Sequence, residues 1–383
     1  MHVVVSKRDL LKVLSRCQGV ADKKSTMPVL GNVLLEVKGP DRLRVAATDL
    51  YLAMSTTLAA EVESGGSVAV GARDLLERVR MMPDGPIAIS VSPNSATSIR
   101  AVGSARRFTL HGVPGEEFPT LPEPDAKAEP HTIDARALSR LISGTYFSIS
   151  TDDTRLHLNS ALFEWDGEHV RMVTTDGHRL SKMEMLLRGN HASTTFLIPL
   201  KGVLELKRLC DEGTAEARGE GGSDVAEISI VQSGPNAFFE LFGLRLSVKL
   251  VDAQFPPYQQ VIPERSEKSV RAPRLEFADA LKAVSVAASD RTGGIKLTLG
   301  NGKIRFQSES PESGEGFDEV AVDYQGNEIS VGFNARYFLD VLGAIEDDEV
   351  VLSVSGELDP AVIRPGTASG NATYLAVVMP MRI

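Results

Sequence analysis

Five consecutive residues, Thr175-Asp176-Gly177-His178-Arg179, bring a hydroxyl, a carboxylate and an imidazole close together in the chain. An aspartate that orients a histidine can make it a general base, so this segment is the best candidate for catalysis. Asp-Gly is also a common turn sequence. A matching aspartate, Asp49, is followed by Leu50-Tyr51 without a histidine. An enzyme that uses Asp176 and His178 is one hypothesis, and a structural turn is the other.

Other motifs of enzymes are missing from the sequence. The segment 300–303 has glycines and a lysine, but not the spacing or the following Ser/Thr of a phosphate-binding loop. There is no Gly-x-Ser-x-Gly elbow and no His-Glu-x-x-His helix. Cys17 and Cys210 are too distant for a disulfide framework or a metal cluster, so we expect buried thiols. The sequence predicts a protein with no catalytic residue, no cofactor and no metal.

The C-terminal segment 374–383 is an apolar run that contains a proline between two methionines. Proline confines such a run to a sheet edge or to the end of a strand. Flexible methionine side chains suit a groove that receives varied partners. The segment is therefore either a strand that closes the core of the last domain or one wall of a partner-binding groove.

The elements that must position these residues recur along the chain. Two segments, 32–49 and 159–176, each run from an asparagine to an aspartate 17 residues later, with two apolar strands between them. A weaker copy follows at 295–309, and a Phe-Pro pair occurs at both 118–119 and 255–256. Repeats of this length indicate whole domains, each of ~128 residues. The predicted domains are 1–127, 128–265 and 266–383, with linkers at 122–130 and 263–273.

Each domain is predicted to hold two amphipathic helices among many short strands, which makes the fold α+β. In the first helix Leu10, Leu14 and Cys17 share one face, and Ser6 is the expected N-cap. The loop 219–224 has the composition of a hairpin connection. The six predicted helices are 6–20, 72–82, 134–145, 199–210, 275–289 and 334–345.

Charge is distributed unevenly over this pattern. The chain has a net charge of −10, yet the six helical stretches hold 14 Lys or Arg and 8 Asp or Glu, which leaves −16 for the remainder. If the helices share one surface, that surface is positive; otherwise these are ordinary solvated faces. The chain has no apolar run of 18 residues, and its N-terminal charges follow the short apolar run, unlike a signal peptide. We expect a cytoplasmic protein.

Five motifs, in the same order and across all three domains, resemble those of the bacterial DNA sliding clamps, the β subunits of the replicative DNA polymerase. The resemblance extends along the whole chain, and five ordered motifs are far more specific than any one of them. The motifs lie at 26–32, 175–180, 255–258, 332–342 and 377–382.

This resemblance implies three similar domains per chain and a head-to-tail homodimer that forms a ring of six domains. Sheets would form the outer wall, and two helices from each domain would line the hole. Duplex DNA would pass through the hole, and weak contacts without sequence specificity would let the ring slide. The protein would tether the replicative polymerase, the clamp loader and repair polymerases, and would have no catalytic site of its own.

The residues expected to bind DNA come from two sources. By resemblance, Lys24 and Arg73 match positions that touch the DNA backbone. The helix pattern adds further cations as lining charges: Arg8, Lys12, Arg16, Arg140 and Lys201. Where some clamps carry two tyrosines, this chain has Leu156-His157, so a contact of that loop with DNA is not predicted.

The resemblance also implies a groove for short apolar peptides between the second and third domains. Gln260 stands where some clamps have arginine, and Thr292 where some have phenylalanine. The expected groove residues are Leu158, Thr175, Gly177, His178, Arg179, Leu180, Pro256, Val261, Asn334, Tyr337, Val377, Met379, Pro380 and Met381.

The subunit contact implied by the resemblance joins the first domain of one chain to the third domain of the other. The expected interface residues are Arg106, Arg107, Phe108 and Leu110 on one side and Glu309, Glu312 and Glu315 on the other. Exposed ion pairs contribute only ~0–1 kcal/mol each, so apolar burial must supply most of the dimer stability. The alternative to a clamp is a cytoplasmic scaffold that binds peptides and never encircles DNA.

Overall fold

The same order of elements occurs three times: a strand, a helix, four strands, a helix and three strands. The computed structural model describes residues 1–22, 24–187, 192–219, 225–264, 268–289, 293–367 and 370–382. The first series comprises β1 (His2–Ser6), α1 (Lys7–Val20), β2 (Asn32–Val37), β3 (Arg42–Thr48), β4 (Leu52–Ser64), β5 (Ser67–Gly71), α2 (Ala72–Arg80), β6 (Pro86–Val91), β7 (Ala96–Ala101) and β8 (Arg107–Pro114).

The second and third series repeat this order. The second comprises β9 (His131–Asp134), α3 (Ala135–Ser143), β10 (Ser160–Asp166), β11 (His169–Thr175), β12 (Arg179–Leu186), β13 (Thr194–Pro199), α4 (Leu200–Gly219), β14 (Glu227–Ser233), β15 (Asn236–Leu241) and β16 (Leu244–Lys249). The third comprises β17 (Lys268–Pro273), α5 (Arg274–Ser285), β18 (Gly294–Gly300), β19 (Lys303–Ser310), β20 (Gly314–Ala321), β21 (Ile329–Asn334), α6 (Ala335–Ala344), β22 (Glu349–Val354), β23 (Ala361–Pro365) and β24 (Ala372–Val378).

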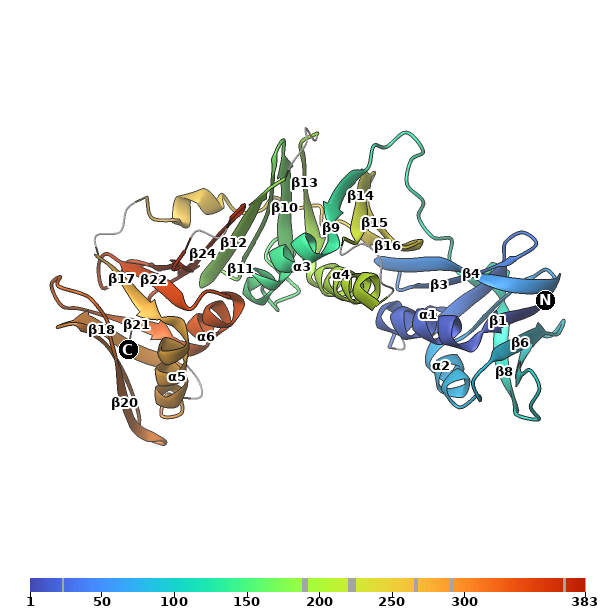
Figure 1. Cartoon of the computed structure of the whole chain (residues 1–383), viewed down its shortest axis with the longest axis horizontal. Helices are drawn as coiled ribbons and strands as arrows, with labels where there is room; N and C mark the ends of the chain where they lie inside the picture. Colours follow the sequence, from blue (N-terminus) through green and yellow to red (C-terminus); the bar gives the residue numbers. More distant parts are fainter. Residues whose placement is uncertain are drawn as a thin grey trace. The chain divides into compact units, whose positions relative to one another are not determined.

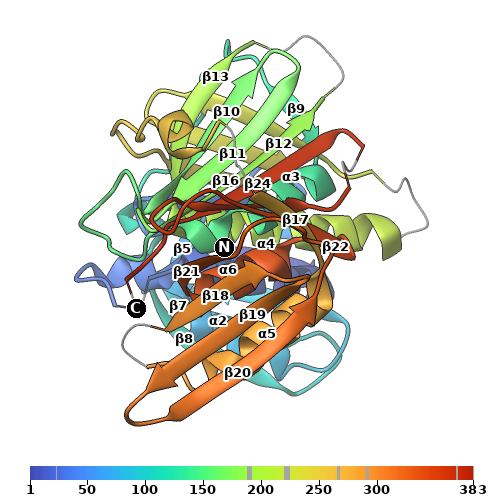
Figure 2. The same ribbon diagram turned by 90° about the vertical axis from the view of Figure 1, so that its left-hand side faces the viewer.

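The strands form three antiparallel sheets in two compact units (Figure 1). The first unit, 1–136 with 205–250, holds a twelve-stranded sheet in the order β1-β6-β7-β8-β5-β2-β3-β4-β16-β15-β14-β9. The second unit, 137–204 with 251–383, holds the eight-stranded sheet β13-β10-β11-β12-β24-β23-β22-β17. It also holds the sheet β20-β19-β18-β21, whose strands lie side by side in Figure 2. In each unit a sheet therefore runs from one series of elements into the next.

Within the first unit, α1 packs on α2 and on β3 and β4. Ser6 is its N-cap and accepts a hydrogen bond from the backbone N–H of Asp9, as predicted. Leu10, Leu14 and Cys17 are fully buried on its sheet-facing side. In the second unit α5 packs in the same way on α6, β19 and β20 (Figure 1).

Three sequence-based expectations need correction or completion. The predicted linker 263–273 is wrong in its second half, because β17 occupies Lys268–Pro273 and pairs with β22 through buried Val270 and Ala272. The helix predicted to end at residue 210 continues to Gly219. Its Gly213 lies against Leu241, where a Cβ would clash, so a helix-weakening residue is retained for close packing. The rest of the predicted loop, 220–224, lies outside the described residues, as does Thr292.

Candidate functional site

The segment first considered for catalysis is a tight turn between β11 and β12. Asp176 Oδ1 accepts the backbone N–H groups of His178 and Arg179, both at 2.9 Å. Thr175 Oγ1 donates to the Arg179 carbonyl at 2.7 Å. Gly177 has φ +91°, a backbone conformation that side chains with a Cβ rarely adopt. The hydroxyl and the carboxylate thus serve to fix the backbone of the turn.

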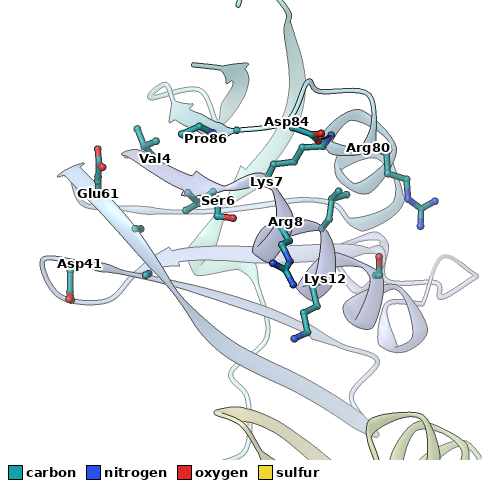
Figure 3. A pocket seen from close by; sticks show the side chains of 16 residues that line it. Val4, Ser6, Lys7, Arg8, Lys12, Asp41, Glu61, Arg80, Asp84 and Pro86 are labelled. Carbon is teal, nitrogen blue, oxygen red and sulfur yellow. Dashed lines mark hydrogen bonds and ion pairs between the residues drawn. The ribbon is translucent and has the colours of Figure 1, made fainter. Parts of the chain in front are cut away.

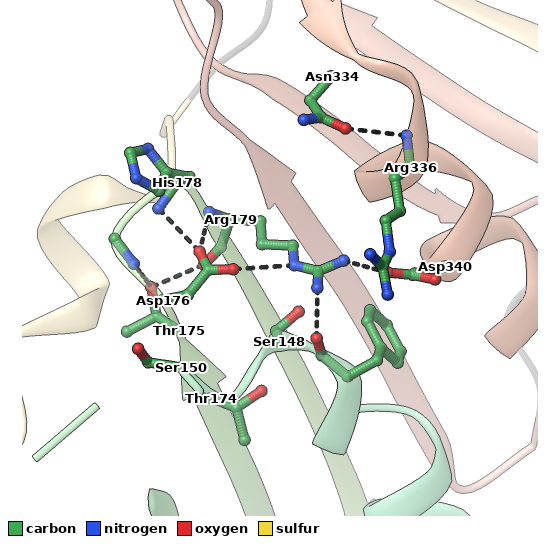
Figure 4. A network of polar contacts seen from close by, with 12 residues as sticks. Ser148, Ser150, Thr174, Thr175, Asp176, His178, Arg179, Asn334, Arg336 and Asp340 are labelled. Atoms are coloured by element: carbon green, nitrogen blue, oxygen red, sulfur yellow. Dashed lines mark hydrogen bonds and ion pairs between the residues drawn. The ribbon is translucent and has the colours of Figure 1, made fainter. Parts of the chain in front are cut away.

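Arg179 is the centre of the polar network that follows this turn (Figure 4). Its side chain is only 9% exposed and lies 3.1 Å from Asp176 Oδ2 and 2.6 Å from Asp340 Oδ2 on α6. It also donates to the carbonyl of Phe147. Its guanidinium lies 4.5 Å from the centre of the Tyr337 ring and 5.5 Å from that of Phe147. This buried cation is fully engaged in joining β12 to α6.

His178 is not oriented by Asp176 for catalysis. Both carboxylate oxygens of Asp176 are occupied by backbone N–H groups and by Arg179. The His178 ring instead stacks on Tyr337, with centroids 6.4 Å apart and an interplanar angle of 17°. Burial of the Tyr337 ring raises its pKa, and the negative charge of Asp176 nearby raises that pKa further. The geometry therefore supports the turn and contradicts the dyad.

A cavity of about 250 Å³ opens beside this turn. Its walls come from β12, from the end of β24 and from the 3₁₀ turn η4 (Tyr258–Val261). The predicted groove residues that line it are Leu158, Thr175, Gly177, Arg179, Leu180, Pro256, Val261, Val377 and Met379. The predicted residues that do not line it are His178, Asn334, Tyr337, Pro380 and Met381.

Three lining residues were not predicted as groove residues: Pro257, Tyr258 and Gln260. Tyr258 is 5% exposed, and its ring packs with the buried apolar side chains on the cavity floor. The sequence motif Phe255-Pro256-Pro257-Tyr258 could have indicated Tyr258 as a lining residue, because a tyrosine that follows two prolines is fixed in an irregular segment. Asn334 has a separate role, since it caps α6 by accepting the N–H of Arg336 at 3.0 Å.

The C-terminal segment contributes both to a core and to the cavity through β24. Neighbouring residues of a strand point to opposite faces. Val378 belongs to the core of the third series, whereas Val377 packs with Leu162, Val173 and Leu180 beneath the cavity. The Met379 N–H then bonds the His178 carbonyl at 2.9 Å, and the Met381 N–H bonds the Gly332 carbonyl at 2.8 Å. One strand thus closes a core and forms a cavity wall.

The predicted DNA-binding cations differ in their exposure and in the ion pairs that they form. Arg8 and Lys24 are exposed and form no ion pair with any described residue. Arg73 is exposed and pairs with Glu77 on the same helix at 2.6 Å. Arg140 lies 3.7 Å from Glu346, and Lys201 is exposed on the first turn of α4.

Arg16 was expected on an exposed face, and this part of the prediction is wrong. Its side chain is 9% exposed and pairs with Glu212 at 2.5 Å and with Glu216 at 3.5 Å, both on α4. Lys12, which is exposed, also pairs with Glu216. Helix α4 reaches these residues because it is longer than predicted. Its additional acidic turns cover one flank of α1.

An open cavity of about 1200 Å³ lies at the N-terminal end of α1 (Figure 3). Arg8 and Lys12 extend into it from α1, and Arg80 from α2. Asp41 and Glu61 lie on the opposite side, and Lys7 bonds Asp84 at 2.9 Å.

The observed helices carry 16 Lys or Arg and 10 Asp or Glu, again a net of +6, and all of this excess lies on α1, α2 and α3.

The predicted subunit-interface residues lie in both units. Arg107, Phe108 and Leu110 are on β8, which pairs with β7, and Arg106 precedes them and donates to the Met81 carbonyl. Glu309 is on β19 and Glu315 on β20, and both are exposed, as is Glu312 between the two strands. Phe317 and Val286 add exposed apolar surface, with 59% and 79% exposure. Leu110 is buried within its own domain at 6% exposure.

Comparisons with known proteins match the whole chain. Family models described as the N-terminal, central and C-terminal domains of the DNA polymerase III beta subunit match residues 1–122, 132–257 and 259–382. The chain is 32% identical to proteins named beta sliding clamp from Pseudomonas aeruginosa and from Escherichia coli K12, each covered fully on both sides. The solved structure of the P. aeruginosa sliding clamp bound to griselimycin is similar with a TM-score of 0.90, 32% identity and full coverage of both chains. Among the described residues no helix is long and apolar enough to span a bilayer.

Proposed function

The chain belongs to the family of the DNA polymerase III beta subunit, the bacterial sliding clamps. From this premise we propose that two copies close head to tail into a ring that encircles duplex DNA without sequence specificity. The ring tethers the replicative polymerase, the clamp loader and repair polymerases, and thereby confers processivity. We also propose that it works in the cytoplasm.

The family match confirms the predicted resemblance and the predicted fold of three similar domains with two helices each. Proteins named sliding clamps are processivity factors without a catalytic activity of their own, so the protein is not an enzyme. The hypothesis of a peptide-binding scaffold that never encircles DNA is not favoured by these matches.

For contact with DNA we propose Arg8, Lys24, Arg73, Arg140 and Lys201, with Lys12 as a weaker contributor. Support comes from their exposed or half-exposed side chains in a chain of net charge −10. For Arg8, Arg73 and Arg140 it also comes from their place on α1, α2 and α3, the helices that hold the positive excess. A ring holds DNA by topology, so a modest positive charge suffices and a strongly basic hole would slow sliding. The DNA-binding proposal leaves out Arg16, because two carboxylates bind its guanidinium.

For partner binding we propose the 250 Å³ cavity, which is the single observation that carries the peptide-tethering part of the function. Its floor is a cluster of apolar side chains on β10, β11, β12 and β24. Exposed Val261 and Met379 stand at its rim, at 44% and 39% exposure. An apolar pocket with exposed flexible rim residues suits short apolar peptide segments. Pro380, Met381, His178 and Tyr337 lie next to the rim residues in the chain or in the turn network.

For the subunit contact we propose the β8 face with Arg106, Arg107 and Phe108 on one protomer. Glu309, Glu312 and Glu315 with exposed Phe317 form the matching face on the partner. Basic and acidic sets of this kind give orientation, and the exposed apolar groups supply the burial. We retain the domain limits 1–127, 128–265 and 266–383 as proposals.

The decisive experiment measures retention on DNA. Protein loaded onto nicked circular DNA should stay bound in 0.5 M salt and should leave when the DNA is cut once, because only linkage survives salt screening. Equal loss from circular and linear DNA would contradict the ring.

The peptide-binding part is tested by deleting 379–383: affinity for griselimycin should fall at least tenfold, while light scattering still reports a dimer. A monomer, or unchanged affinity, would contradict that part.

A further inference from the structure

A hydrogen-bonded row of charged side chains crosses the sheet beside the candidate groove. Glu164, Arg171 and Glu184 are direct neighbours on β10, β11 and β12. Arg171 lies 3.6 Å from Glu164 and 2.7 Å from Glu184, and all three are about one-fifth exposed. Burial acts to lower the pKa of Arg171, but the negative charge of Glu184 acts to raise it. The net pKa of Arg171 is raised, so the guanidinium stays charged.

The same face of these strands is apolar at its other end. The cavity floor is formed by Leu162, Val173 and Leu180. Leu162 on β10 and Val173 on β11 lie two residues from the charged row, and Leu180 on β12 lies four residues from it. Alternation along a strand puts them on the face that carries the charged row. This face is thus apolar under the cavity and polar beyond it.

Tyr258 lies across this boundary. Its ring packs on the apolar floor, and its hydroxyl donates to Glu164 Oε2 at 3.1 Å. Burial, followed by the Glu164 charge, raises the pKa of Tyr258 to about 12, so the phenol remains a donor at neutral pH. Tyr258 begins η4, the short turn whose Gln260 and Val261 form one cavity wall.

Among the described residues, few polar contacts fix that wall. The segment 250–257 has no helix or strand, and η4 itself is held by single backbone bonds such as Gln260 N–H to the Pro257 carbonyl at 3.1 Å. A wall on an irregular segment is positioned by its anchored side chains. The Tyr258 hydroxyl is the polar anchor, and Phe255 and Ile262 are the partly buried apolar ones.

We propose that Glu164 and Arg171 are positioning residues for partner binding. Through the Tyr258 hydroxyl they set the distance between the η4 wall and the β24 wall, without touching the bound segment. This inference rests on the proposed function of the cavity.

The first series of elements supplies a matched control. Glu36 and Arg44 are direct neighbours on β2 and β3, lie 3.6 Å apart, and have similar exposure to Glu164 and Arg171. The first Phe-Pro marker there leads to Leu121, which has no hydroxyl, in the place of Tyr258. Arg44 reaches Glu123 instead, at 3.6 Å. Glu36 and Arg44 thus form the same cross-strand ion pair as Glu164 and Arg171, but they do not line the candidate groove.

The test measures the affinity for griselimycin, used as the probe, on the full-length dimer. Tyr258→Phe and Glu164→Leu should each weaken binding about tenfold, as expected for a lost hydrogen bond to a charged group. The double variant should bind no more weakly than either single one, because both remove the same bond. Glu164→Gln keeps an acceptor and should restore affinity to within about twofold of the wild type. Glu36→Leu should lower the melting temperature without changing affinity.

The inference is overturned if Tyr258→Phe binds as tightly as the wild type, if the two single effects add, or if Glu36→Leu weakens binding equally. Failure of the proposed function is distinguishable from these outcomes. In that case deletion of 379–383 would leave affinity unchanged, whereas under this inference the deletion lowers affinity at least tenfold whatever residue occupies position 258.

Discussion

Two junctions between consecutive series of elements use the same backbone turn for different purposes. At the first, Asp49 Oδ1 accepts the N–H groups of Tyr51 and Leu52 at 2.9 and 2.6 Å. Asp176 does the same at the second for His178 and Arg179. In each, a threonine hydroxyl donates 2.7 Å across the turn, and the residue after the aspartate has positive φ, +74° at Leu50 and +91° at Gly177.

The two turns also receive the neighbouring series in the same way. The Tyr51 carbonyl accepts the N–H of Lys249 at the end of β16, at 2.8 Å. The His178 carbonyl accepts the N–H of Met379 after β24, at 2.9 Å. The last residue of the turn then differs, since Leu52 is an apolar core residue and Arg179 is a buried cation. The backbone fixes the junction, and the side chains that follow give it a role.

What lies beside each turn separates the two junctions further. The second has the apolar cavity and the Arg179–Asp340 bond that joins β12 to α6. The first has a row of ion pairs between α1 and α4, in which Arg208 also donates to the carbonyls of Ser15 and Arg16. One junction carries the cavity proposed to bind a partner segment, and the other joins two helices through ion pairs.

The strongest way to break the comparison is to remove each aspartate. Asp176→Ala should destabilise the protein by about 3 kcal/mol, because it deprives buried Arg179 of a partner. Griselimycin affinity should fall at least tenfold with it. Asp49→Ala, which removes the acceptor of two backbone N–H groups, should cost about 1 kcal/mol. Urea unfolding and calorimetric binding of both variants provide the measurement. Equal losses of stability would show that Arg179 adds nothing to the turn.

The row of ion pairs is tested by the double variant Glu212→Gln, Glu216→Gln. It frees Lys12 and Arg16, so nonspecific affinity for duplex DNA should rise and the slope of log K against log salt should steepen by up to about 2. Diffusion on DNA should slow accordingly. Fluorescence anisotropy at several salt concentrations measures the slope. The double variant Glu319→Gln, Glu328→Gln, whose carboxylates pair with Lys303 and Arg305, is the control of equal charge change. An equal effect of the control would assign the change to net charge.

Exchanging the positive-φ residues sharpens the comparison with smaller effects. Leu50→Gly should stabilise the first turn by up to about 1 kcal/mol, since leucine is strained at φ +74°. Gly177→Ala should destabilise the second by a similar amount, although its Cβ would lie 3.5 Å from Arg155 and would not clash. Thermal unfolding of both variants measures the two shifts, and shifts of the same sign would refute the strain argument.

The smallest effect is expected at the two cysteines, which both belong to the first junction. Burial raises the pKa of Cys17 to about 12 and that of Cys210 as well. The thiols therefore stay protonated, and iodoacetamide at pH 8 should leave the native protein unmodified by mass spectrometry. Because the folded pKa is raised, their contribution to stability is complete below about pH 8.5 and decreases as pH rises above it. Rapid alkylation of the native protein would contradict this burial.

The local pattern of the sequence predicted the repeat and the six helices, and the resemblance of its motifs to a known family predicted most of the cavity lining. These depend on short-range signals: the spacing of Leu10 and Leu14, the cap at Ser6, and motifs such as Phe255-Pro256. The failures depend on contacts distant in the chain. No pattern around Arg16 announces Glu212, and nothing near Gly213 shows that Leu241 requires its missing side chain.

The sequence alone therefore determined the family, through its ordered motifs, and the three-domain plan, through its repeats and a hydrophobic periodicity that acts over a few residues. It left the segment at Asp176 open between a catalytic group and a turn. Only the tertiary structure decided which charges remain exposed, that His178 stacks on Tyr337, and that Tyr258 bonds Glu164. Burial and ion pairing are set by residues brought together from distant parts of the chain, and their energies depend on distances that a linear sequence does not contain.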